Sequence, residues 1–453
     1  MTSFDIVIVG GGTAGEQAAG TALGLGKSVA IIERGPFGGD CIFHACIPTK
    51  ALVHAARYYK RLGAASFFGL PEIESKAHYA EVKAYKDRVV APIASKRDQR
   101  WRDRGATVIP GNARFLSSTV LEVDGQQVTG ENIIICTGSH PAVPPIPGLA
   151  EAGYITNVEA LELEKLPQRL AVIGGGPIGM ELGQVFAAFG TSVTVYEATD
   201  RLLPLEDAEI SEAFQSICTR QGIEIRTSVR VVQVKQGTGG KSVTVEALDG
   251  TRTEAEHDEI LVSVGRRPSI EALDLDAAGI NHTNKGIPTD STQKTNVPHV
   301  WAAGDVTGGY LFTYVAGGQA KNAVLNAVDE GHRTVNYDVL PRATFCDPEI
   351  ASVGLTEAQA RAAGHETVTG KFEYANLTRS ILTGETEGFA KVVVDAPGGA
   401  IVGGHIIGLE ASTLIHELSA AMKAGLTAKE LGNTLHAYPT LSEAVRYACQ
   451  AVP

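Results

Sequence analysis

Residues 4–15 read FDIVIVGGGTAG, an apolar run followed by the glycine pattern GxGxxG at Gly10, Gly12 and Gly15. Small residues continue beyond the pattern, as at the start of a helix that packs closely on a strand. Such glycines permit a tight turn and let a pyrophosphate approach the N-terminus of the helix. This stretch therefore predicts a strand, a turn and a helix that bind a dinucleotide.

The same arrangement recurs at residues 169–179, which read RLAVIGGGPIG. In both units a second apolar strand ends in an acid 23 residues after the first glycine, at Glu33 and at Glu197. Such an acid accepts hydrogen bonds from ribose hydroxyls. One glycine pattern alone is weak evidence, but two with their acids in register predict two Rossmann-type sites. The glycines of the second pattern are Gly174, Gly176 and Gly179.

The acid of the second unit bears on the choice of nicotinamide cofactor. A 2′-phosphate would meet like charge at Glu197 and finds no arginine immediately beside it. NAD is therefore expected over NADP. Arg201, four residues further on, keeps NADP as the less favoured alternative.

Two cysteines follow the first unit closely, Cys41 and Cys46 in the run GGDCIFHACIPTK of residues 38–50. A regular helix would hold their Cα atoms roughly 8 to 9 Å apart, beyond the ~7 Å that a disulfide tolerates. The backbone between them must therefore be irregular, and Pro48 supplies a reason because it has no N–H and crowds the preceding turn. Beside a dinucleotide motif, the pair predicts a redox-active disulfide next to a flavin; two buried thiols or half of a metal site are the alternatives.

Composition limits the class of protein. A chain of 453 residues suggests about three domains at ~150 residues each. The formal net charge of −12 argues against a nucleic-acid or anionic-membrane partner, and no apolar stretch of ~20 residues indicates a membrane span. The first residues run directly into a strand rather than into a cationic leader. Six sparse cysteines favour a reducing cytoplasm, so we expect a cytoplasmic enzyme with small diffusible ligands.

The order of the motifs carries a family resemblance. A Pro-rich connector at residues 139–148 separates the two units, an apolar strand leads to Gly304-Asp305, and the C-terminal part contains YPTLSE at residues 438–443. Together with the glycine and cysteine motifs, these segments resemble the class I flavoprotein disulfide reductases, also called class I pyridine nucleotide-disulfide oxidoreductases. Dihydrolipoamide dehydrogenase, glutathione reductase and mercuric reductase belong to that family. The resemblance covers essentially the whole chain.

The resemblance implies an α/β fold with two Rossmann-like dinucleotide-binding domains, one for FAD and one for NAD, and an α+β C-terminal dimerisation domain. The implied FAD domain comprises residues 1–148 and 266–335, the NAD domain residues 149–265 and the interface domain residues 336–453. It also implies a homodimer. The implied FAD-binding residues are Gly10, Gly12, Gly15, Glu33, Gly138, Gly304 and Asp305, and the implied NAD(H)-binding residues are Gly174, Gly176, Gly179 and Glu197.

The resemblance also implies roles in electron transfer from NADH to flavin, to the disulfide and then to a substrate. Cys46 takes the place of the thiol that faces the flavin, and Cys41 that of the thiol that exchanges with substrate. Lys50 and Glu181 match an ion pair near the flavin ring.

One position departs from the family pattern. Tyr438 stands where the family has a histidine that pairs with a glutamate five residues later, and that glutamate remains as Glu443. A phenol with an ordinary pKa near ~10 is a poor base at neutral pH but can donate a proton. His436, two residues upstream, is either a substitute base or a structural histidine, and the structural role is the preferred interpretation.

These features lead to one main hypothesis and two rivals. The main one is an FAD enzyme that exchanges electrons between NAD(H) and a small disulfide or dithiol, most similar to dihydrolipoamide dehydrogenase. The first rival is mercuric-reductase-like reduction of a metal or quinone; soft metals suit paired thiolates, but only Cys449 is present where true mercuric reductases have an adjacent cysteine pair. The second rival is a flavoprotein subunit that docks on a lipoyl-carrying or other redox protein. No resident metal is expected.

Overall fold

The computed structural model describes residues 2–71 and 77–453 of the chain. The chain forms two compact units, each assembled from three stretches of sequence. Unit 1 comprises Met1–Thr49, Ala84–Ala142 and Gly265–Val335, and unit 2 comprises Lys50–Lys83, Val143–Val264 and Asn336–Pro453.

A seven-stranded sheet forms the centre of unit 1, in the order β3-β2-β1-β6-β5-β4, with β16 also paired to β6. The strands β3, β2, β1, β6 and β16 pair in parallel, and β4 and β5 add an antiparallel edge. Its strands are β1 (Thr2–Val9), β2 (Val29–Glu33), β3 (Thr107–Pro110), β4 (Ala113–Phe115), β5 (Val120–Val123), β6 (Gln126–Ile135) and β16 (Val300–Ala302). A small antiparallel pair joins β7 (Ser139–Pro141) to β15 (Arg266–Pro268).

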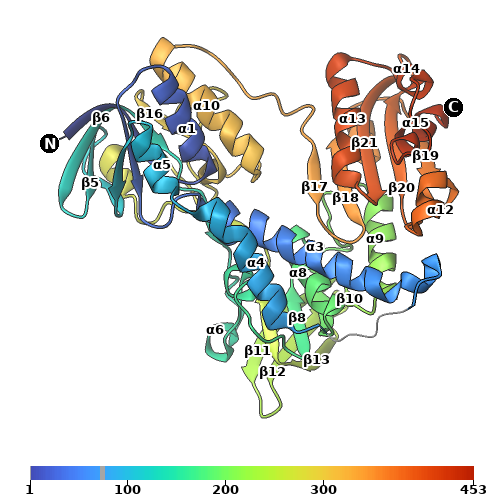
Figure 1. Cartoon of the computed structure of the whole chain (residues 1–453). Helices are drawn as coiled ribbons and strands as arrows, with labels where there is room; N and C mark the ends of the chain where they lie inside the picture. The colour runs from blue at the N-terminus through green and yellow to red at the C-terminus, as the bar shows by residue number, and fades with distance from the viewer. Residues whose placement is uncertain (1, 72–76) are drawn as a thin grey trace. The chain divides into compact units, whose positions relative to one another are not determined.

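Both faces of this sheet are covered, which explains the continuous apolar run of β1. Successive side chains of a strand point to opposite faces, and Ile6 and Ile8 pack into one core while Val7 and Val9 pack into another. The helices α1 (Thr13–Gly24) and α10 (Thr313–Asp329) lie side by side over the first of these cores (Figure 1). The other helical segments are α2 (Gly39–Phe43), α5 (Arg97–Asp103), η2 (Leu275–Ala278) and η3 (Asp305–Thr307).

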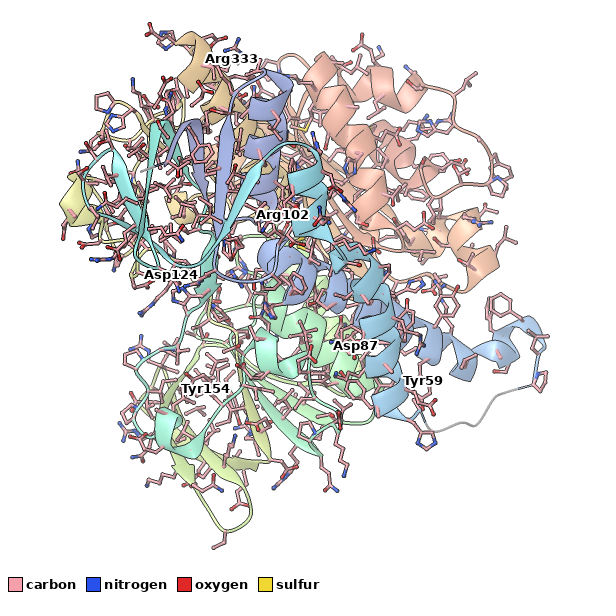
Figure 2. All side chains as sticks on the ribbon, turned by 60° about the vertical axis from the view of Figure 1, so that its left-hand side comes forward. Tyr59, Asp87, Arg102, Asp124, Tyr154 and Arg333 are labelled. Atoms are coloured by element: carbon pink, nitrogen blue, oxygen red, sulfur yellow. The ribbon has the colours of Figure 1, made fainter. Side chains whose placement is uncertain are left out.

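Two helices continue from one unit into the other, α3 (Cys46–Gly63) and α4 (Tyr79–Ala94). Within each unit, side chains tie helices to the neighbouring elements. Tyr59 of α3, labelled in Figure 2, stacks on Phe189 in unit 2 with ring centroids 5.3 Å apart. Arg102 of α5, labelled in the same view, donates to the Val108 carbonyl oxygen of β3 at 3.1 Å in unit 1.

The middle of the chain contributes a second parallel sheet to unit 2, in the order β10-β9-β8-β14. An antiparallel sheet, β11-β12-β13, follows it. The elements are α6 (Leu149–Ala152), α7 (Asn157–Ala160), β8 (Arg169–Ile173), α8 (Pro177–Ala188), β9 (Ser192–Tyr196), α9 (Ala208–Arg220), β10 (Glu224–Arg226), β11 (Val229–Gln236), β12 (Lys241–Ala247), β13 (Arg252–His257) and β14 (Glu259–Val262), with η1 (Ala65–Phe68) further upstream.

The C-terminal part forms a five-stranded antiparallel sheet, β17-β18-β21-β20-β19, with the helix α13 packed against it (Figure 1). The elements are β17 (Arg342–Thr344), β18 (Glu349–Gly354), α11 (Glu357–Ala362), β19 (Thr367–Glu373), η4 (Tyr374–Asn376), α12 (Thr378–Thr383), β20 (Phe389–Asp395), β21 (Ala400–Gly408), α13 (Ala411–Ala424), α14 (Ala428–Asn433) and α15 (Glu443–Gln450).

The predicted α/β fold with two strand-turn-helix nucleotide units and an α+β C-terminal region is confirmed. The limits of three domains along the chain stay a prediction. Among residues 2–71 and 77–453, the helices are all too short or too polar to cross a membrane.

Candidate active site

The first glycine turn joins β1 to α1 and leaves open space where the sequence predicts a pyrophosphate. Gly10 has a φ of +110°, which favours glycine, and a Cβ on Gly15 would collide with the Gly10 carbonyl oxygen. Gly12 differs, because a Cβ there would meet only the Gly39 Cα, at 3.7 Å. Gly12 is also the N-cap of α1 and provides no side-chain cap. The amides at this helix end therefore face a space that suits an anion.

Glu33, the last residue of β2, folds back on this turn. Its carboxylate accepts hydrogen bonds from the Gly11 amide at 2.6 Å and the Gly35 amide at 2.7 Å. A cavity of about 330 Å³ opens beside it, lined also by Gly10, Asn112 and Thr137. The Thr137 hydroxyl is buried and has no hydrogen-bond partner in the described structure. A buried hydroxyl of this kind is satisfied by a polar ligand, so these residues fit the nucleotide end of FAD.

The Gly304-Asp305 segment belongs to the same unit. Gly304 has a φ of +83°, and a Cβ there would lie 3.2 Å from the Ala316 Cβ of α10 and 3.4 Å from the Ala14 Cβ of α1. The Asp305 carboxylate accepts a hydrogen bond from the Ser139 hydroxyl at 2.6 Å. Gly138, the neighbour of Ser139, has open space around its Cα. Unit 1 thus brings together all seven residues predicted for FAD.

The second glycine turn repeats the first in unit 2. Gly174 has a φ of +105°, a Cβ on Gly179 would collide with the Gly174 carbonyl oxygen, and a Cβ on Gly176 would meet nothing within 4 Å. Gly176 is the N-cap of α8 without a side-chain cap. In both turns, therefore, the first and last glycines of the motif allow the tight turn, and the middle glycine leaves room for a ligand.

Glu197 follows β9 and is buried against this second turn. Its carboxylate accepts hydrogen bonds from the Gly175 amide at 2.7 Å and from the amide and hydroxyl of Thr199 at 2.7 and 2.8 Å. Arg201 donates to the Pro204 carbonyl oxygen at 3.3 Å, while its buried Nε has no partner in the described structure. Glu197 is thus held firmly at the position predicted to meet the ribose.

The backbone between Cys41 and Cys46 is broken, as the disulfide geometry requires. The helix α2 ends at Phe43, His44 leaves the helical region with φ −133° and ψ 1°, and α3 begins at Cys46. Pro48 lies in the first turn of α3, where a missing N–H costs nothing. The predicted irregularity is confirmed, and it lies just before Pro48 rather than at it.

Cys46 meets a residue that the sequence did not single out. Its Sγ lies 3.4 Å from the Thr313 Oγ1, and Thr313 is the first residue of α10. A hydroxyl donor and the N-terminus of a 17-residue helix both favour a thiolate over a thiol. No sequence motif predicts this contact, because Thr313 lies 267 residues from Cys46 in the sequence.

Burial separates the six cysteines into two classes. Cys41 and Cys46 are partly exposed, whereas the other four are buried. Burial raises the pKa of Cys136, Cys218 and Cys449 to about 12 and also raises that of Cys346. Thiols of this kind stay protonated and unreactive at neutral pH.

Lys50 and Glu181 form the ion pair that the resemblance implies. Lys50 Nζ donates to Glu181 Oε2 at 2.7 Å, and the Phe345 amide donates to Glu181 Oε1 at 2.8 Å. The Glu181 side chain is 6% exposed and that of Lys50 is 35% exposed. Both carboxylate oxygens of Glu181 therefore accept hydrogen bonds, whereas the Lys50 side chain stays partly exposed.

Tyr438 and Glu443 do not bond to each other as the family histidine and glutamate are expected to do. Tyr438 is 70% exposed, and its hydroxyl donates to the Thr378 Oγ1 at 3.3 Å. Glu443 is buried and accepts from the Thr440 amide at 3.1 Å and the Tyr447 hydroxyl at 3.0 Å. Tyr447 thus occupies the carboxylate that the missing histidine would need.

His436 has protein contacts at both ring nitrogens. Its Nε2 lies 2.6 Å from Glu417 Oε1 and its Nδ1 lies 2.9 Å from the Thr434 carbonyl oxygen. The side chain is only 7% exposed. Both ring nitrogens are engaged, which supports the preferred interpretation.

Comparisons with known proteins find similar sequences over almost the whole chain. The sequence pattern of the pyridine nucleotide-disulphide oxidoreductase family matches residues 4–331, and that of the family's dimerisation domain matches residues 340–449. The mercuric reductase of Staphylococcus aureus is 36% identical over 450 residues, which cover 98% of this chain and 82% of the relative. Dihydrolipoyl dehydrogenase 3 of Pseudomonas putida is 35% identical over 462 residues, which cover 100% of this chain and 98% of the relative.

Solved structures extend the likeness to the whole fold. The HOCl-induced flavoprotein disulfide reductase RclA from Escherichia coli matches with a TM-score of 0.89 at 30% identity, covering 98% of this chain and 99% of RclA. The Cu(II) complex of the same reductase matches with a TM-score of 0.89, covering 99% of each chain.

Proposed function

Since this chain belongs to the pyridine nucleotide-disulphide oxidoreductase family, we propose that it transfers electrons between NAD(H) and a small disulfide or dithiol through Cys41 and Cys46. Enzymes of this family use FAD and NAD(P)H. When bound, FAD supplies the two-electron chemistry that links the nicotinamide to a disulfide. In this chain the turn at Gly12 with Glu33 would hold FAD, and the turn at Gly176 with Glu197 would hold NAD(H).

One observation carries the assignment of the redox pair. Of the six cysteines, only Cys41 and Cys46 are partly exposed, and they flank the helix break that a disulfide between them requires. The Thr313 hydroxyl beside Cys46 adds a donor that favours its thiolate. In the proposed roles, Cys46 faces the flavin and Cys41 exchanges with the substrate. Lys50 and Glu181 would maintain the charge balance near the flavin ring.

A lipoamide-type dithiol is the first substrate to test. The like charge of Glu197 favours NAD over NADP, and NAD preference accompanies lipoamide chemistry in the family. A dihydrolipoyl dehydrogenase is 35% identical to this chain and a mercuric reductase is 36% identical, so the identities are compatible with either substrate. The chain would act as a homodimer through its C-terminal domain, with a free small substrate or a lipoyl-carrying protein as its electron partner.

Reduction of a metal ion or a quinone is the second candidate. Tyr438 favours it, because an exposed phenol can donate a proton but is a poor base for a dithiol. The relatives include mercuric reductases, and one of the similar solved structures is a Cu(II) complex of RclA. Dedicated mercury detoxification is less favoured, since Cys449 is buried and cannot pass a metal inward from the C-terminus.

Steady-state reduction of NAD⁺ by dihydrolipoamide tests the main proposal. The native enzyme should turn over, and Cys41→Ser and Cys46→Ser should each lose at least about a hundredfold in kcat, while the buried-thiol control Cys449→Ala should keep most of it. Negligible native turnover that Tyr438→His restores would contradict the lipoamide assignment. NADH oxidation driven by Cu(II), Hg(II) or a quinone would then be measured in the native enzyme and in Cys46→Ser.

A further inference from the structure

The C-terminal segment offers no imidazole for the exchange thiol. Tyr438 donates to Thr378, and Glu443 is occupied by Thr440 and Tyr447. His436 has both ring nitrogens engaged. A disulfide exchange still needs a group that removes a proton from the attacking thiol and returns it to the leaving one.

His44 lies within the cysteine motif itself. It is the C-cap of α2, three residues after Cys41, and its amide donates to the Asp40 carbonyl oxygen at 2.8 Å, so its Cα still follows the last turn of the helix one turn from Cys41. Its Nδ1 lies 3.2 Å from the Asp40 Oδ1, and its side chain is 41% exposed. Because a carboxylate only accepts hydrogen bonds, we assign the hydrogen to Nδ1, which faces Asp40, and this leaves Nε2 as the basic nitrogen.

Asp40 is fixed from its other side by Arg266. The Arg266 guanidinium donates to Asp40 Oδ2, while its Nε donates to the Ser139 hydroxyl at 2.7 Å. The Arg266 side chain is only 11% exposed. Asp40 therefore presents one oxygen to a buried cation and the other to the imidazole. An imidazole held by a carboxylate is the part of a thiol-imidazole-carboxylate triad that activates a nucleophilic cysteine elsewhere.

We propose that His44, oriented by Asp40, is the acid and base for Cys41 within one subunit, in place of the histidine that Tyr438 replaces. This inference rests on the proposed disulfide chemistry. His44 Nε2 takes the proton of the Cys41 thiol as Cys41 Sγ attacks one sulfur of the substrate disulfide. The substrate S–S bond breaks, and the expelled thiolate receives that proton.

The second half of the exchange completes the balance of electrons and protons. The Cys46 thiolate attacks Cys41 Sγ, the mixed disulfide breaks, and the second substrate thiolate takes a proton from solvent. The substrate disulfide gains two electrons and becomes two thiols, and the enzyme loses two electrons as the Cys41–Cys46 disulfide forms. Reduction by NADH restores the two enzyme thiols.

Alkylation of Cys41 tests the role apart from turnover. The FAD-loaded enzyme is reduced with NADH under anaerobic conditions and treated with iodoacetamide between pH 6 and 9, and the labelled Cys41 peptide is measured by mass spectrometry. Among the recorded contacts, Asp40 faces His44, Arg266 faces Asp40, and Asp305 lies 3.9 Å from the Arg266 Nε. Native enzyme is compared with His44→Gln, with Asp40→Asn and with the matched control His436→Gln.

At pH 7, His44→Gln should lower the Cys41 alkylation rate at least about tenfold and Asp40→Asn by less, while His436→Gln stays within about twofold of native. At pH 9 the three variants should approach the native rate, because an ordinary thiol ionises near pH ~8.5 without help. Equal Cys41 alkylation rates in the native enzyme and in His44→Gln at pH 7 would overturn the role of His44. A decrease in the alkylation rate of His44→Gln that is the same at every pH would overturn it as well. Absence of any NADH-dependent labelling, in native enzyme and variants alike, would overturn the proposed disulfide chemistry and this inference with it.

Discussion

Cys46 Sγ lies 3.4 Å from the Thr313 Oγ1, so the thiol that begins α3 meets the hydroxyl that begins α10. The contact joins two helix starts in unit 1 that are 267 residues apart in the sequence. A hydrogen bond to a charged group contributes about 1.5–3 kcal/mol, and a helix N-terminus adds about 0.3–1 kcal/mol for a negative charge near it. Thr313 is therefore expected to stabilise the Cys46 thiolate.

The variant Thr313→Val removes this hydroxyl and keeps the shape of the side chain. We expect the thiolate fraction of Cys46 in the NADH-reduced enzyme to fall about tenfold at neutral pH, since ~1.4 kcal/mol corresponds to a factor of ten. The measurement is the long-wavelength thiolate-flavin absorbance, followed as a function of pH. Thr313→Ser, which retains a donor, is the control, and equal absorbance in Thr313→Val and Thr313→Ser would exclude the hydroxyl as its source.

The second glycine turn allows ligand binding to be tested apart from folding. A Cβ on Gly176 meets no protein atom within 4 Å, whereas a Cβ on Gly179 collides with the Gly174 carbonyl oxygen. Gly176→Ala should therefore fold normally and raise the KM for NADH about tenfold or more, because its methyl group occupies the pyrophosphate space. Gly179→Ala should instead lower the Tm by several degrees.

Thermal unfolding and NADH kinetics of the two variants separate these effects. A normal KM in Gly176→Ala would place the pyrophosphate elsewhere. A Gly179→Ala variant as stable as the native protein would show that the turn can relax.

The sequence was most informative about the two nucleotide-binding units, where the same motif occurs twice. The equal offsets of Glu33 and Glu197 predicted two Rossmann-type units, and in both units the carboxylate accepts a hydrogen bond from an amide of the glycine turn, Gly11 or Gly175. The disulfide distance limit likewise predicted a backbone break before Cys46. These predictions succeeded because short-range geometry decides them.

Long-range partners could not be predicted in the same way. The contacts of Arg266 with Asp40 and of Cys46 with Thr313 span 226 and 267 residues, and no residue pattern marks either pair. The hydroxyl of Tyr438 reaches Thr378 rather than Glu443 for a similar reason, since Tyr447 of α15 already bonds to that carboxylate. Such pairings depend on how elements pack and not on local spacing.

Glu197 should control the choice between NADH and NADPH. Its removal in Glu197→Ala takes away the ribose acceptor and three hydrogen bonds to the protein, from Gly175 and Thr199. We expect kcat/KM for NADH to fall about ten- to a hundredfold, while kcat/KM for NADPH changes much less because a like charge has been lost. Steady-state kinetics with both nucleotides gives the ratio, and Arg201→Gln is the companion variant for the NADPH side. An equal loss with both nucleotides would mean that Glu197 only supports the turn.

His257 should make the stability of the protein depend on pH. Burial, reinforced by the positive charge of Arg169, lowers its pKa from 6.5 to about 4, and its Nε2 pairs with the Tyr196 hydroxyl at 2.9 Å. The folded state therefore disfavours the charged imidazole, and the unfolded chain binds the additional proton between pH 6.5 and 4. The free energy of unfolding should thus be unaffected by His257 above pH 7 and should fall as the pH drops through this window.

The variant His257→Gln removes that proton-binding site, so its stability should decline less steeply with acid. After allowance for solvent screening, the native protein should lose on the order of 1 kcal/mol more than the variant between pH 7 and pH 5, or about 1 °C in Tm for a chain of this length. Thermal unfolding of both proteins at half-unit pH steps measures the difference. The comparison rests on the slopes, since the substitution also alters the contact with Tyr196 and shifts the whole curve. Parallel curves across this pH range would show that His257 gains its proton as readily in the folded protein as in the unfolded chain.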